Sequence, residues 1–121
     1  MTSEEYARYV GKFMLGVARD FGVSREEYAY RRLFSMAATR IMFDGKDEYA
    51  EKDDTVQSVE RKSPAMLVQD IEEEATDLAA YASALAMKGD GYHEECEELV
   101  FLSLQIMQVT ENIRATWERD E

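Results

Sequence analysis

The stretch Asp70-Ile71-Glu72-Glu73-Glu74-Ala75-Thr76-Asp77, followed by Leu78-Ala79-Ala80-Tyr81, decides the fold expected for this chain. Its residues favour a helix, and at about 100° of rotation per residue two lines run side by side along that helix. The apolar stripe comprises Leu67, Ile71, Leu78 and Leu85, and the line beside it comprises Asp70, Glu74, Asp77 and Tyr81. We therefore expect Glu74 and Asp77 at the edge of the core.

Carboxylates this close together repel one another, and their burial is costly unless a positive charge lies between them. A hard divalent cation bound through oxygen atoms relieves that repulsion. The acidic line therefore predicts a Mg²⁺ site, and Mn²⁺ suits the same carboxylate ligands.

The composition indicates a single globular domain that spans residues 1–121. A chain of 121 residues with 45% hydrophobic residues is large enough for one core and too apolar to be wholly disordered. The net charge of −12 argues against direct binding to nucleic acid or to an anionic membrane, because both require a basic face. The single Cys96 excludes an internal disulfide and a site built from thiolates alone.

No apolar run of 18 residues and no signal-peptide pattern occurs in the sequence, so we expect a cytoplasmic protein. Helix-forming residues dominate, and the periodicity predicts four helices at about 3–21, 25–43, 64–88 and 92–117. Their starts are indicated by Thr2 with Glu5, by Ser24 with Glu27, and by Ser63 before Pro64. The predicted fold class is all-α, with a four-helix-bundle-like arrangement.

The last predicted helix carries more apolar surface than one stripe requires. Its stripe comprises Cys96, Leu99, Val100, Ser103, Ile106, Met107, Thr110, Ile113 and Trp117. Phe101, Leu102 and Leu104 widen this surface, which indicates burial on two sides, as at a subunit interface. The sequence therefore favours a homo-oligomer.

The polar segment of residues 44–63 is longer than a plain connection needs, so we expect it to lie over a ligand site. Lys46 to Lys52 can form a short helical turn within it. The only concentrated positive charge comes from Arg25, Arg31, Arg32 and Arg40. These arginines either form a solvated face paired with acids elsewhere, or place Arg40 against a phosphate or the acidic cluster.

Two acidic pairs have the spacing of one helical turn: Glu48 with Glu51, and Glu74 with Asp77. Residues three apart on a helix point the same way, so each pair can offer two carboxylates to one ion. Two such pairs brought face to face would hold one or two Mg²⁺ ions, with water and phosphate oxygens as the other ligands.

These motifs resemble those of the MazG-like all-α nucleoside triphosphate pyrophosphohydrolases of phages and bacteria. The order Glu-x-x-Glu, then Glu-x-x-Asp, is similar to their signature, and the run from Glu73 to Tyr81 is similar to their Glu-Glu-x-x-Asp-x-x-x-Tyr form. Gly45-Lys46-Asp47-Glu48-Tyr49 resembles the Gly-x-x-Glu-Tyr that often precedes it. The resemblance covers roughly residues 44–86.

The resemblance implies a dimer or tetramer that hydrolyses a nucleoside triphosphate to the monophosphate and pyrophosphate. It implies Mg²⁺ ligands at Glu74, Asp77 and Glu48 or Glu51, and a proton acceptor at Glu73 or Asp70. The expected substrate-binding residues are Lys46 and Lys52, with Arg61 or Lys62, for the phosphates, Arg40 at the second helix end, and Tyr49 or Tyr81 for the base or sugar.

The sequence is also compatible with three other interpretations of the acidic residues and of the whole chain. The acids Glu72 to Glu74 can form a solvated face paired with the arginines of the second helix. The chain can be a non-catalytic acidic helical module that binds a nucleotide or a protein, because the first acidic pair lies in a charged stretch after Gly45. It can also be a purely structural helical oligomer.

Overall fold

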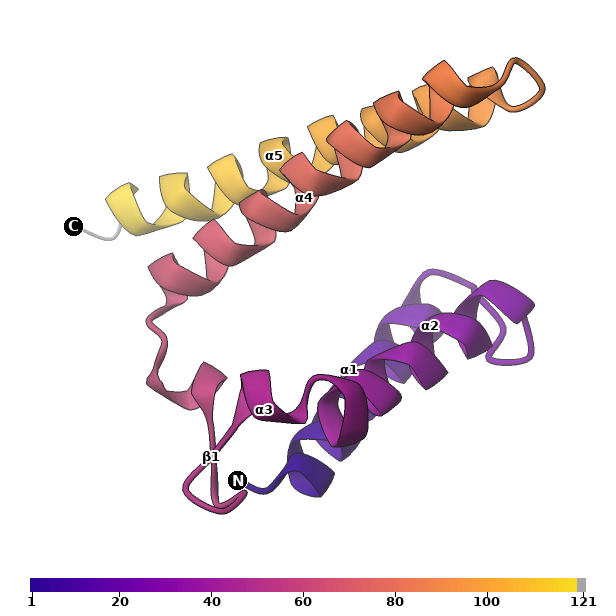
Figure 1. The fold of residues 1–121 in the computed structure, drawn as a ribbon. Coiled ribbons are helices and arrows are strands. Elements are labelled where there is room, and N and C mark those ends of the chain that lie inside the picture. The colour runs from indigo at the N-terminus through magenta and orange to yellow at the C-terminus, as the bar shows by residue number, and fades with distance from the viewer. Residues whose placement is uncertain (120–121) are drawn as a thin grey trace. The chain divides into compact units, whose positions relative to one another are not determined.

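The computed structural model of this protein describes residues 1–119 and is mostly helical, so the all-α prediction is confirmed. It contains two compact units, Met1–Arg61 and Lys62–Glu121 (Figure 1). The MazG-like four-helix arrangement stays a prediction.

Helix α1 (Ser3–Asp20) begins with the capping box predicted for Thr2 and Glu5. The Thr2 hydroxyl accepts a hydrogen bond from the Glu5 amide at 3.1 Å, and the Glu5 carboxylate accepts one from the Thr2 amide at 3.1 Å. This pair satisfies two amide groups that the helix start would otherwise leave without partners. The chain leaves α1 through Gly22, whose φ of +71° suits glycine.

Helix α2 (Tyr28–Thr39) continues as a π-helical turn, η1 (Arg40–Asp44), which the sequence did not indicate. The capping box predicted for Ser24 and Glu27 is wrong. The Ser24 hydroxyl accepts from the amide of Glu26, two residues on, and so closes a turn before the helix. Glu27 is the N-cap residue, and its side chain makes no capping hydrogen bond.

Residues 46–61 form short elements: α3 (Lys46–Tyr49), β1 (Ala50–Glu51), β2 (Val56–Gln57) and the 3₁₀ helix η2 (Ser58–Arg61). The helical turn predicted for Lys46 to Lys52 is confirmed only as far as Tyr49, because the chain continues from there as strand β1, and the antiparallel strands were not predicted. Three consecutive residues with φ of 51°, 56° and 64° make the turn between the strands: Lys52, Asp53 and Asp54.

A buried polar network fastens this turn to the start of α1. The Asp54 carboxylate accepts hydrogen bonds from the Ser3 amide at 2.7 Å and the Ser3 hydroxyl at 2.6 Å. The side-chain Nε2 of Gln57, a fully buried residue, donates to the same carboxylate at 3.2 Å. Hydrogen bonds from Ser3 hold the pKa of Asp54 below its usual value.

Helices α4 (Pro64–Lys88) and α5 (His93–Arg119) form an antiparallel hairpin (Figure 1). The start predicted for α4 is confirmed, because the Ser63 hydroxyl accepts from the Met66 amide at 3.2 Å and Pro64 occupies the first turn.

Small side chains form the contact between these two helices. Its most buried residues recur every seven positions: Val68, Ala75 and Ala82 on α4, and Cys96, Ser103 and Thr110 on α5. The stripe expected for the last helix is confirmed at these three α5 positions. The stripe expected for α4 is only partly buried: Leu67 and Leu78 are half-buried, whereas Ile71 and Leu85 are 47% and 44% exposed. Alanine lets two helices approach closely, so the larger aliphatic residues flank the contact instead of filling it.

A second close approach joins α1 to α2. A side-chain carbon at Gly11 would lie 2.8 Å from the ring of Phe34, so that ring packs directly on the glycine. Large apolar side chains of this unit are nevertheless exposed, among them Phe13 at 65% and Leu33 at 60%.

The α4–α5 contact gives a direct stability prediction. Replacement of Ala82, which is 3% exposed, by Leu should destabilise the protein by about 1–3 kcal/mol, because overpacking forces the helices apart. Urea unfolding followed by circular dichroism measures this change. The matched variant Ala80→Leu alters an exposed alanine of the same helix and should leave the midpoint nearly unchanged; equal effects from both variants would contradict the small-residue contact.

Candidate functional site

The acidic line of α4 faces away from α5. Helical periodicity places Asp70, Glu74, Asp77 and Tyr81 on one side, opposite the buried stripe that contains Ala75. Glu74 and Asp77 are exposed, and neither carboxylate forms an ion pair or hydrogen bond within residues 1–119. Tyr81 is 74% exposed, so its ring is available at the surface. The expected position of Glu74 and Asp77 at the edge of a core is therefore wrong for the α4–α5 hairpin.

The two predicted proton acceptors differ in their surroundings. The Asp70 carboxylate accepts a hydrogen bond from the Lys62 ammonium at 2.6 Å. Glu73 is exposed and has no ion-pair partner in the described part of the chain. Only Glu73 thus offers a carboxylate without a cation bound to it.

Glu72 is the one acid of this run that is tied to α5. Its carboxylate accepts from the Arg114 guanidinium at 2.6 Å and from the Thr110 hydroxyl at 2.8 Å. The Arg114 and Thr110 hydrogen bonds lower the pKa of Glu72, and the same ion pair raises the pKa of Arg114. The interpretation of Glu72 to Glu74 as a solvated face paired with arginines therefore holds for Glu72 alone. Its partner is Arg114 of α5 and not an arginine of α2.

The first acidic pair is occupied by cations. A guanidinium nitrogen of Arg40 lies 2.8 Å from Glu48, and one of Arg61 lies 2.6 Å from Glu51. Arg40, which follows α2, is therefore paired with the acid Glu48. This agrees with the interpretation in which the arginines of the second helix pair with acids elsewhere in the chain. A metal ion would have to replace a guanidinium at either glutamate.

The remaining predicted substrate residues lie around α3. The Lys46 ammonium is 3.7 Å from the Asp54 carboxylate, and the Tyr49 ring packs against Tyr6 with 6.1 Å between centroids. Burial raises the pKa of the Tyr6 hydroxyl. Lys52 begins the left-handed turn and accepts hydrogen bonds from Thr55 through its carbonyl oxygen.

Within residues 1–119, no group of three or more His, Cys, Asp or Glu side chains is placed to hold a metal ion. Glu48 and Glu51 belong to the first unit, and Glu74 and Asp77 belong to the second. Glu74 and Asp77 lie one turn apart on α4, whereas the helical spacing expected for Glu48 and Glu51 is wrong, because α3 ends at Tyr49 and Glu51 belongs to strand β1.

Comparison of the chain with protein-family models, with curated proteins and with solved structures finds no match. None of the helices in residues 1–119 combines the length and apolar character needed to cross a membrane.

The pairing of Glu72 with Arg114 and Thr110 was not predicted, because 42 and 38 residues separate them in the sequence. No local spacing links such positions. Glu72 can be paired with Arg114 and Thr110 only when α4 and α5 are known to be antiparallel. The first half of α4 then lies beside the last part of α5.

The Glu72–Arg114 pair should make stability depend on pH. Because the folded-state pKa of Glu72 is lowered, the pair stabilises the fold above the unfolded-state pKa of about 4.3, and this contribution is lost as pH falls through the folded-state value. We expect Arg114→Gln to lower the melting temperature at pH 7 and to have a much smaller effect near pH 3. Thermal unfolding at both pH values measures this; Arg119→Gln removes the same charge at the exposed end of α5 and should show no such pH dependence.

Proposed function

We propose that this protein is a Mg²⁺-dependent nucleotide pyrophosphohydrolase of the MazG-like type, with Glu74 and Asp77 as metal ligands. The main support is a difference among the acidic side chains in whether they have a cationic partner. Four other predicted or neighbouring acids have a cationic partner: Glu48, Glu51, Asp70 and Glu72. Glu74 and Asp77 lie one helical turn apart on a long helix and have none within residues 1–119.

Two carboxylates fit what magnesium requires of a protein. Mg²⁺ keeps several waters and is commonly held by one or two carboxylates together with substrate phosphates. Glu74 and Asp77 would therefore suffice when a triphosphate supplies the other oxygen atoms, and Mn²⁺ fits the same set. Glu48 and Glu51 are proposed as further ligands, which requires them to exchange Arg40 and Arg61 for the ion.

When bound, Mg²⁺ would neutralise phosphate charge and polarise a water molecule. Glu73, adjacent to Glu74 and without a cationic partner in the described chain, is the better proton acceptor for that water, since Asp70 already accepts from Lys62. Tyr81, on the same side of α4, is proposed to contact the base or sugar. Lys46, Lys52 and Tyr49 are proposed to bind the substrate from the first unit.

The ion pairs of Glu48 and Glu51 favour a second function, a binding module without catalysis. Arg40 and Arg61 satisfy Glu48 and Glu51 without a metal ion, as expected for a helical binding module that retains the fold but does not hydrolyse nucleotides. The alternative therefore predicts nucleotide binding without pyrophosphate release.

We also propose that the α4–α5 hairpin pairs with a second copy. Helical periodicity places nine aliphatic residues on one side of it: Leu67, Ile71, Leu78, Leu85, Leu99, Leu102, Ile106, Val109 and Ile113. With 25 residues in α4, this face is ~38 Å long and about two helix diameters wide, which gives ~750 Å². A standard interface buries about 800 Å² per partner, so a symmetric pair of hairpins has enough area.

The metal proposal predicts that Mg²⁺ or Mn²⁺ raises the melting temperature, because a ligand that binds only the folded state stabilises it. Glu74→Gln and Asp77→Asn should each abolish this rise and reduce pyrophosphate release from a panel of nucleotides by roughly a hundredfold or more, since several kcal/mol of charge stabilisation are lost.

Differential scanning calorimetry and a pyrophosphate-release assay provide the two measurements. Glu98→Gln, at an exposed acid of α5, is the matched control and should behave as the unmodified chain. Nucleotide binding that depends on Mg²⁺ but releases no pyrophosphate would select the binding module, and melting that is insensitive to both ions would reject the metal site.

The hairpin proposal predicts a dimer in sedimentation equilibrium. Leu102→Asp places a charge in the proposed interface and should shift the protein to monomer, because burying an unpaired carboxylate is costly. Gln108→Asp adds the same charge on an exposed position outside the nine-residue face and should leave the dimer intact. A monomeric unmodified chain, or equal effects of the two variants, would contradict the proposal.

A further inference from the structure

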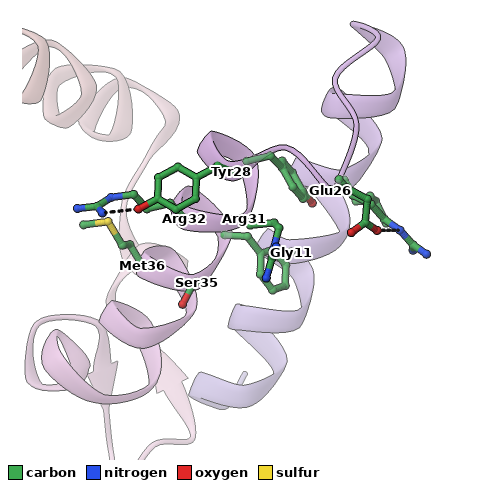
Figure 2. A pocket seen from close by; sticks show the side chains of 11 residues that line it. Gly11, Glu26, Tyr28, Arg31, Arg32, Ser35 and Met36 are labelled. Atoms are coloured by element: carbon green, nitrogen blue, oxygen red, sulfur yellow. Dashed lines mark hydrogen bonds and ion pairs between the residues drawn. The ribbon is translucent and has the colours of Figure 1, made fainter.

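A broad cleft lies along one side of the α1–α2 pair (Figure 2). Its volume is about 1010 Å³, at the upper end of the range of small-molecule sites. Three guanidinium groups and three aromatic rings line it: Arg25, Arg31, Arg32, Tyr28, Tyr30 and Phe34. Figure 2 shows Tyr28 and Arg32 at one edge and Glu26 at the opposite edge.

The arginines of this cleft are poorly neutralised. Arg25 lies 3.7 Å from Glu26, the one carboxylate in the lining. Arg32 donates to the neutral hydroxyl of Tyr28 at 3.2 Å, and Arg31 has no ion-pair partner within residues 1–119. The cleft therefore carries a formal charge of about +2 in a chain whose net charge is −12.

The charge of the whole chain is distributed unevenly around this feature. Residues 1–39 contain six Lys or Arg and five Asp or Glu, whereas residues 40–121 contain eight and 21. Exposed charges are screened beyond about 8 Å at physiological ionic strength, so the local excess of guanidinium groups governs what approaches the cleft. An anion is attracted to this part of the chain and repelled by the rest.

The aromatic rings give the cleft a flat contact surface. Tyr28 is 74% exposed, and its hydrogen bond to Arg32 fixes the ring beside a guanidinium. The Phe34 ring packs on Gly11, where any side-chain carbon would lie 2.8 Å from it. Planar guanidinium groups match phosphate oxygens in a bidentate manner, and aromatic rings stack on nucleobases.

We propose that this cleft is a second nucleotide-binding site, in which Arg31 and Arg32 bind the phosphates and the base stacks on Tyr28. The site requires no divalent cation, because guanidinium groups already supply the positive charge. It does not use Glu74 or Asp77, so it is independent of the proposed hydrolysis. An acidic protein segment matches the arginines but makes no use of the exposed Tyr28 ring, which is why the observations favour a nucleotide.

Titration calorimetry of the full chain with ATP in the presence of EDTA tests the proposal. We expect ATP to bind, and the double variant Arg31→Gln, Arg32→Gln to weaken binding by at least about tenfold, since hydrogen bonds between charged groups are lost. Tyr28→Leu should weaken ATP but leave inorganic tripolyphosphate unchanged, because only ATP has a base. Arg119→Gln is the matched control and should have no effect.

Glu74→Gln with Asp77→Asn should leave ATP binding in EDTA unchanged, so failure of the hydrolase proposal and failure of this one give different results. Absence of ATP binding in EDTA, or binding that the double arginine variant does not weaken, would overturn the second site. So would a poly-glutamate peptide that binds through Arg31 and Arg32 while ATP does not. Circular dichroism of each variant checks that these exposed substitutions leave the helices intact.

Discussion

The close approach of α4 and α5 through small side chains is the constraint on which the second unit depends. Alanine and other small residues at seven-residue spacing bring the helices together: Ala75 and Ala82 are buried on α4, and Ser103 is buried on α5. The larger aliphatic residues then have no place between the helices and lie along one side of the hairpin. The same rotation of α4 turns its acidic line outward. One packing choice thus produces both an exposed apolar face and an exposed pair of carboxylates.

The ion pairs decide which acids are available for chemistry. The chain has 26 acidic and 14 basic side chains, so cations cannot neutralise every carboxylate. Those within reach of a fixed guanidinium or ammonium are neutralised in place, as Glu48 is by Arg40 and Glu72 is by Arg114. Glu74 and Asp77 have no such partner within residues 1–119, and repulsion between carboxylates this close is relieved by water or by a bound cation. Other acids of residues 1–119 also have no cationic partner, Glu95 and Glu98 of α5 among them, so this feature adds to the acidic motif and does not replace it.

Local signals in the sequence predicted the parts of the fold that local interactions determine. Thr2 and Ser63 cap their helices as expected, since a capping hydrogen bond spans three residues. Ser24 shows the limit of such reasoning, because the same side chain can close a turn one residue earlier. The small-residue contact was not predicted, since hydrophobicity favours the Leu and Ile stripe and does not report how closely two helices approach. Glu72 with Arg114 needed knowledge of the antiparallel pairing, as no sequence spacing connects them.

The two proposed nucleotide sites place opposite demands on charge. Carboxylates such as Glu74 and Asp77 repel phosphates, so that site can hold a nucleotide only after a divalent cation reverses its local charge. Arg31 and Arg32 attract phosphates directly, and a divalent cation competes with them for the same oxygens. Raising the concentration of Mg²⁺ should therefore favour the first kind of site and disfavour the second. Such opposed sites are compatible in one chain because its acids are unevenly distributed: 21 of the 26 lie after residue 39, whereas residues 1–39 contain six basic and five acidic residues.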